Sequence, residues 1–148
     1  MKVSRVKNLM LSGISITTNN KNEQDEEKAK IPGLWDDYVE NRIETKTHDK
    51  ANNSFMFGVY SDYESDLNGD YKVTLAVEVT KPKKAMIIED QRYLVFDKKG
   101  ELPDIVIETW KEIWDYFENN SEYERAYAVD FEKYSKREEV EIFISIKS

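Results

Sequence analysis

One segment, residues 58–79, constrains the fold of this chain more strongly than any other. Every second residue is apolar at 55–59 and again at 73–79, which is typical of strands that bury one face. Between these runs lies the pair Asn68-Gly69, and both residues tolerate the positive φ that a tight hairpin turn requires. The segment therefore predicts an antiparallel hairpin.

Acidic residues are placed unusually in this hairpin. Asp62, Glu64 and Asp66 come just before the turn, and Glu78 interrupts an otherwise apolar strand. A carboxylate in such a strand needs a partner, water or a ligand, because burying an unpaired charge is costly. Glu78 is therefore a candidate ligand-binding residue.

The remaining elements follow from the same kind of pattern. Apolar residues recur at helical spacing near 31–45 and 103–119, which predicts two main helices. Alternating or apolar runs at 9–18 and 92–96 predict strands, and the segment 125–146 predicts a second hairpin. A strand, a helix and two strands thus occur twice in order.

This repetition predicts an internal duplication within a single domain, residues 1–148. Module one covers about 8–80 and module two about 90–147. The motifs YSDYE and AVDFE occupy similar places in the two modules, so we expect Glu64 and Glu132 to be equivalent. The fold class is therefore α+β, with duplicated β-α-β-β modules.

Charge and composition restrict the chemistry of the chain. The formal net charge is −8 at pH 7, and direct nucleic-acid binding is not expected, because phosphate binding needs a basic face. An acidic surface suits a cationic partner, although it also serves solubility alone. The chain has no cysteine, and its one histidine, His48, lies among polar residues. We therefore expect no cofactor, no metal site and no His-based catalytic triad.

The expected location is cytoplasmic. No apolar run approaches the ~20 residues of a membrane-spanning helix, and the N-terminal segment lacks a signal-peptide core. The first expected strand begins near residue 9, which leaves too little chain before it for a helix-turn-helix. We therefore expect neither membrane binding nor a DNA-binding part.

Several longer motifs carry a resemblance to a known family. These motifs are spread over nearly the whole chain and occur in the same order as in that family: SGISITTNN, AKIPGLWDDY, VYSDYESD with NGDY, YLVFDKKG, ETWKEIWDYF and RAYAVDFEKY. Together they resemble the AraC-type effector-binding domain, also called the GyrI-like domain, and in particular its stand-alone, integron-associated members. The resemblance implies two SHS2-type modules about a pseudo-twofold axis, an antiparallel sheet, two main helices and a ligand cleft between the modules.

The last strand suggests which side chains face that cleft. Its aliphatic residues at 140–146 alternate with Glu141 and Phe143, so one face packs on a helix while the other carries an acid beside an aromatic ring. Glu78 falls on the matching face of the first hairpin. One interpretation is a cation site, because carboxylates and ring faces both attract cations. The other interpretation is a solvated sheet face.

The resemblance implies a principal site residue, Glu132 in the motif DFEKY. The alternative for Glu132 is a strand-edge carboxylate paired with Lys133 or Arg125. Glu64 is its expected counterpart, or a residue that pins the turn. Four aromatic residues are candidate walls of the site: Tyr60, Tyr127, Trp35 and Trp114. For the two tryptophans, helical spacing is also consistent with a position in a core.

These observations lead to one functional hypothesis and two alternatives. The leading hypothesis is a small-molecule effector-binding protein, a sensor or sequestering module that takes an amphiphilic organic cation. The first alternative, implied by the resemblance, is a hydrolase of strained electrophilic toxins with Glu132 as general base. The second is an inhibitory module that binds a protein partner.

Overall fold

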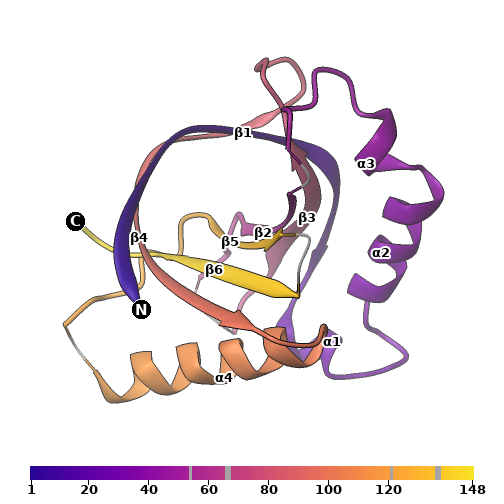
Figure 1. Cartoon of the computed structure of the whole chain (residues 1–148). Coiled ribbons are helices and arrows are strands. Elements are labelled where there is room, and N and C mark those ends of the chain that lie inside the picture. The colour runs from indigo at the N-terminus through magenta and orange to yellow at the C-terminus, as the bar shows by residue number, and fades with distance from the viewer. Residues whose placement is uncertain (54, 66–67, 121, 136–137) are drawn as a thin grey trace.

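The computed structural model describes residues 1–53, 55–65, 68–120, 122–135 and 138–148. The elements, in chain order, are β1 (Lys2–Thr18), α1 (Asn20–Glu23), α2 (Ile31–Glu40), α3 (Ile43–Lys46), β2 (Met56–Ser61), β3 (Tyr71–Glu78), β4 (Met86–Lys99), α4 (Asp104–Asn119), β5 (Asp130–Ser135) and β6 (Glu139–Ser145). The strands form a closed antiparallel barrel, with α4 along one side and α2 and α3 along another (Figure 1). No helix in the described ranges is both long and apolar enough to cross a membrane.

The strand order shows how the two halves of the chain combine. Around the barrel the order is β1-β3-β2-β5-β6-β4, so in each half the first strand pairs with the third and the third with the second. The pairs β2–β5 and β1–β4 join the halves and close the barrel. The α+β fold predicted from the sequence is confirmed, and the antiparallel sheet is closed rather than open.

The strand alternation divides the apolar side chains among three cores. One fills the barrel interior and includes Phe57, Tyr93, Phe131 and Phe143. The second lies between the barrel and α4, and the third between the barrel and α2. Two of the three cores thus depend on a helix that covers the outer surface of the barrel.

The first predicted helix is interrupted. The spacing predicts one helix near 31–45, but α2 ends at Glu40 and α3 begins at Ile43. Arg42, between them, has a φ of 51°, a left-handed value that a right-handed helix cannot accommodate. The second helix, predicted near 103–119, is confirmed as α4.

The strands are longer than the sequence pattern indicates. The predicted strand 9–18 is the second half of β1, and the predicted strand 92–96 lies within β4. The first hairpin is confirmed by the β2–β3 pairing, with a connection longer than a two-residue turn. Asp66 lies outside the described residues.

One interpretation of the sequence places the cleft on the sheet face opposite the helices, the face that carries Phe143, and this interpretation is wrong. That face is the barrel interior, where the Phe143 ring stacks on Phe131 with centroids 4.4 Å apart. A small closed barrel fills its interior with side chains, so a ligand site has to lie outside it.

Candidate functional site

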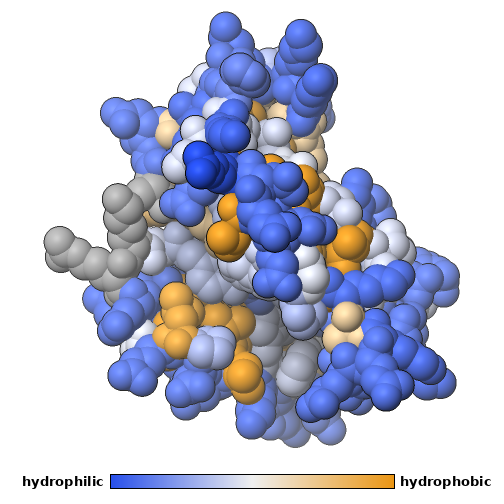
Figure 2. All heavy atoms as spheres, turned by 90° about the vertical axis from the view of Figure 1, so that its right-hand side faces the viewer, coloured by the Kyte–Doolittle hydropathy of each residue, from blue (hydrophilic) through white to orange (hydrophobic). Residues whose placement is uncertain are grey.

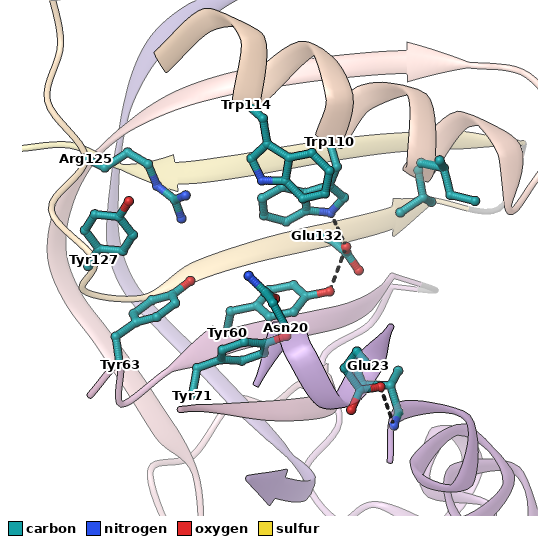
Figure 3. Close-up of a pocket in the computed structure, with 13 residues that line it drawn as sticks. Asn20, Glu23, Tyr60, Tyr63, Tyr71, Trp110, Trp114, Arg125, Tyr127 and Glu132 are labelled. Carbon is teal, nitrogen blue, oxygen red and sulfur yellow. Dashed lines mark hydrogen bonds between the residues drawn. The ribbon is translucent and has the colours of Figure 1, made fainter. Parts of the chain in front are cut away.

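A cavity of about 400 Å³ lies outside the barrel, on the side that the helices cover. Figure 3 shows Trp110 and Trp114 pointing into it from α4, with Tyr60, Tyr63 and Tyr71 on the side of the first hairpin. Aromatic residues form the largest group of the lining: Tyr60, Tyr63, Tyr71, Trp110, Trp114 and Tyr127, with the aliphatic Ile31, Val106 and Ile107 and the polar Asn20, Glu23, Arg125 and Glu132. A cavity of this size and character lies within the usual range of small-molecule sites.

Glu132 is the central polar residue of this cavity. It lies in the middle of β5 and is only 5% exposed. Its Oε2 accepts hydrogen bonds from the Tyr60 hydroxyl at 3.0 Å and from Trp110 Nε1 at 2.7 Å. Its Oε1 accepts one from the Tyr134 hydroxyl at 2.7 Å. The carboxylate is thus held in place by three neutral donors.

The electrostatics of Glu132 are those of a charge without a counter-charge. Burial raises its pKa, while the hydrogen bonds from Trp110, Tyr134 and Tyr60 lower it, and burial is the larger effect. None of the ion pairs among the described residues includes Glu132. A cation in the cavity would therefore stabilise the ionised carboxylate.

The two phenols that bind Glu132 remain donors at neutral pH. Burial, and then the nearby Glu132 carboxylate, raise the pKa of Tyr60 and of Tyr134 well above the usual value. Both hydroxyls therefore keep their protons and direct them at the carboxylate. Tyr134 reaches Glu132 because side chains two residues apart lie on the same face of a strand.

A buried ion pair, formed by Arg125 and Asp130, lies at another wall of the cavity. Arg125 Nη2 is 2.8 Å from Asp130 Oδ2, and their side chains are 10% and 0% exposed. Asp130 also accepts hydrogen bonds from Tyr63 and from the backbone and side chain of Ser145. The Arg125 guanidinium lies 4.3 Å from the centroid of the Tyr127 ring. Asp130 neutralises Arg125, so this group leaves the charge of Glu132 unbalanced.

Glu23 is the other acid of the lining. The segment 19–30 contains α1, and Glu23 ends that helix. The Glu23 carboxylate accepts hydrogen bonds from Thr18 and from the backbone amides of Lys30 and Ile31. It therefore ties the segment to the start of α2, where the helix dipole favours a negative charge. Within the described part of the chain, no group of three or more His, Cys, Asp or Glu residues is arranged to hold a metal ion.

Residues 3–146 match the family described as integron-associated effector binding protein. The chain belongs to this family. A relative from Bacillus subtilis (strain 168), YobU, which carries the provisional name of a transcriptional regulator protein, is 29% identical over 149 residues. That match covers 92% of this chain and 91% of YobU.

Solved structures agree with the family assignment. An integron cassette protein from the mobile metagenome of Vibrio cholerae superposes with a TM-score of 0.86 at 29% identity, over 99% of this chain and 95% of that one. A structure described as SAV2435 bound to tetraphenylphosphonium superposes with a TM-score of 0.79 at 20% identity, over 99% and 93%. At this lower identity the likeness shows a shared fold.

Four of the residues proposed from the sequence line the cavity of this effector-binding protein: Glu132, Tyr60, Tyr127 and Trp114. Trp114 is 53% exposed, so it belongs to the cavity wall rather than to a core. Trp35 lies outside this cavity and lines a neighbouring one, which also contains Glu132. Whether any of these residues binds a ligand stays a prediction. The alternative partners of Glu132 are engaged elsewhere, since Arg125 pairs with Asp130 and Lys133 lies over the Phe55 ring.

The structure does not bring the other proposed residues to the cavity. Glu78 accepts a hydrogen bond from Asn53 at the end of β3, and Glu141 lies opposite Asp97 and Lys133 in the sheet. Phe143 fills the barrel interior. All three were proposed to share one ligand site with Glu132, and the structure does not bring them together, because Glu132 pairs with Ile142 and faces the helices.

The expected equivalence of Glu64 and Glu132 is also wrong. Glu64 follows the end of β2 and is exposed, whereas Glu132 is buried in the middle of β5. The backbone amide of Glu64 donates to the Asp70 carbonyl, so the residue belongs to the hairpin connection. The similar motifs therefore do not mark equivalent positions of the two strands.

Sequence reasoning missed two of the three groups that bind Glu132, Trp110 and Tyr134. Signals for both were present. Trp110 lies four residues before Trp114, which places the two side chains on one helix face. Tyr134 lies two residues after Glu132 on one strand face. Tyr63, Tyr71 and Arg125 come to the cavity through loops and pairing that no local pattern predicts.

Proposed function

We propose that this effector-binding protein binds an amphiphilic organic cation in the aromatic cavity, with Glu132 as the counter-charge. One observation carries the proposal. Glu132 is buried, accepts three hydrogen bonds from neutral donors, and has no cationic partner among the described residues. A buried acid of this kind is stabilised most by a cation that enters its cavity.

The surrounding rings suit the same ligand class. Coulomb attraction is stronger in a poorly solvated cavity than in water, and the face of an aromatic ring adds cation–π attraction of about 0.5–2 kcal/mol. Apolar groups of the ligand would be removed from water against Trp110, Trp114 and Tyr60. The net charge of −8 also favours the approach of cations over anions.

A structural relative supports this ligand class. SAV2435, which has the same fold, is described as bound to tetraphenylphosphonium, a cation with four aromatic rings. The provisional name of YobU, a transcriptional regulator protein, supports a regulatory context. We infer that the present protein acts as a sensor or a sequestering module for such cations.

The test compares two ions of matched shape and opposite charge. Isothermal titration calorimetry measures the affinity of the wild type for tetraphenylphosphonium and for tetraphenylborate. We expect the cation to bind more tightly, and the substitution Glu132→Gln to weaken its binding by about 1–3 kcal/mol, since the variant keeps the shape and loses the charge. Glu141→Gln is the matched control, because Glu141 lies outside the cavity. Equal affinity of wild type and Glu132→Gln for the cation would remove Glu132 from the site.

A further inference from the structure

Glu132 lines two cavities rather than one. The second, of about 460 Å³, also has Tyr60, Ile31, Val106 and Ile107 in common with the aromatic cavity. The two spaces therefore share a wall of five residues, and Glu132 is the only ionisable carboxyl group of that shared wall in the described part of the chain.

The hydrogen bonds of Glu132 indicate how the carboxylate stands between them. Trp110, which binds Oε2, lines only the aromatic cavity. Tyr134, which binds Oε1, lines only the second cavity. The two carboxylate oxygens thus have partners from different cavities, and a positive centre beside Glu132 would have space on both sides.

The walls of the two cavities differ in chemistry. The residues found only in the second cavity are mostly apolar: Trp35, Met56, Leu102 and Pro103, with Tyr134. The aromatic cavity, in contrast, includes Arg125, Glu23 and Asn20. Leu102 and Ile107 are 44% and 53% exposed, so the second cavity reaches the protein surface. Figure 2 shows apolar side chains in patches on an otherwise mainly hydrophilic face.

We propose that the second cavity receives an apolar arm of the ligand, so that the preferred ligand is an elongated cation. Its aromatic part occupies the aromatic cavity, its positive centre lies at Glu132, and an alkyl chain extends past Ile107 into the second cavity. This inference rests on the proposed function, since it extends the same site. It predicts that affinity depends on the length of one arm of the cation.

The test uses triphenylphosphonium cations that carry one alkyl chain, from methyl to decyl, in isothermal titration calorimetry. In the wild type we expect each added CH₂ group that enters the second cavity to raise the affinity roughly three- to fourfold. The gain per CH₂ should fall clearly in Leu102→Asn, a substitution at a half-exposed position, and in Trp35→Ala. Trp114→Ala is the matched control, because Trp114 lines the aromatic cavity and does not line the second one. It should weaken every member of the series while keeping the wild-type gain per CH₂.

The outcomes separate this inference from the function on which it rests. If the methyl compound does not bind the wild type, or binds Glu132→Gln equally well, the proposed function is wrong and the elongated ligand with it. If the methyl compound binds and depends on Glu132, but the gain per CH₂ is the same in Leu102→Asn, Trp35→Ala and wild type, only the second cavity is excluded. A reduced gain in both variants, and not in Trp114→Ala, supports the inference.

Discussion

Gly58 lies opposite Glu132 across the β2–β5 pair, and a Cβ atom on Gly58 would lie 2.9 Å from Oε1 of Glu132. The missing side chain at position 58 leaves the space that the carboxylate occupies. Glycine in a strand normally lowers stability, because it loses more conformational freedom on folding than other residues. Here the absence of a side chain on Gly58 allows the buried carboxylate of Glu132 to lie close to the backbone of β2.

Gly58→Ala is therefore expected to displace the Glu132 carboxylate from its three donors. Because charge-assisted hydrogen bonds are lost, we expect tetraphenylphosphonium binding to weaken by about 1–3 kcal/mol, measured by calorimetry. The control is Gly33→Ala in α2, where the added Cβ meets nothing within 4 Å. That substitution should raise the free energy of unfolding by about 0.5–1 kcal/mol and leave binding as it is. Unchanged cation affinity in Gly58→Ala would contradict this view of the site.

The raised pKa of Glu132 predicts how stability depends on pH. The folded protein holds a proton that the unfolded chain releases above its usual pKa of 4.5. The stability that this carboxyl contributes is therefore fully present below pH 4.5 and is lost as the pH rises through the folded pKa. We expect the free energy of unfolding of wild type, measured in urea, to fall relative to that of Glu132→Gln over this range. Parallel pH profiles would show that the pKa of Glu132 is not raised.

Cation binding should have the opposite pH dependence. The ionised carboxylate is the form that attracts a cation, so the affinity for tetraphenylphosphonium should increase as the pH rises through the folded pKa of Glu132 and then level off. Calorimetry in buffers of different ionisation enthalpy should also show that binding releases a proton in this range. Glu132→Gln should show neither effect.

The buried pair of Arg125 and Asp130 is expected to be important for stability. Arg125→Met leaves the fully buried Asp130 carboxylate without its cation, which should lower the free energy of unfolding by about 3–5 kcal/mol. Lys147→Met is the control, since the Lys147–Glu124 pair is 58% and 73% exposed and its loss should cost at most about 1 kcal/mol. Equal effects of the two substitutions in urea denaturation would contradict this expectation.

In the hydrolase alternative, Glu132 would have to bind and activate a water molecule as general base. A carboxylate offers about four acceptor positions, and three of those of Glu132 already receive hydrogen bonds, which leaves little room for a catalytic water. We expect no hydrolysis above buffer in a panel of cyclopropane-containing electrophiles followed by mass spectrometry. The result in favour of a hydrolase would be turnover that falls by about 10²–10⁴-fold in Glu132→Gln.

The sequence was sufficient to locate the main strands and helices, but not to assign the faces of the barrel. Alternation at 140–146 separates two faces of β6, and packing of the aliphatic face on α4 is confirmed. Alternation alone cannot say that the other face, with Phe143, lies inside a closed barrel. Closure depends on the β1–β4 pairing between residues far apart in sequence, such as Val3 and Leu94. The cleft was therefore predicted on the wrong side.

The site was predictable to the extent that it depends on single strands and helices. Glu132 was proposed from the motif DFEKY, and it does line the cavity. Glu64 was proposed from a similar motif, but β2 ends at Ser61, before that motif does. On β2 the residue opposite Glu132 is Gly58, and a residue without a side chain gives no sign of its function in a pattern of side chains.

The closed order of the six described strands also limits how this protein can bind another macromolecule. An open sheet offers unpaired backbone groups at its edges, to which a partner can add a strand. In the barrel each strand has a neighbour on both sides, so the unpaired backbone groups of the described strands are limited to parts of strands, as in β1, which pairs with β4 over residues 2–11 and with β3 over residues 11–18. The helices offer a partner another surface: α4, which carries Trp110 and Trp114, has one face on the cavity and another in solvent. A shift of that one helix on the barrel could transmit occupancy of the cavity to the outer surface.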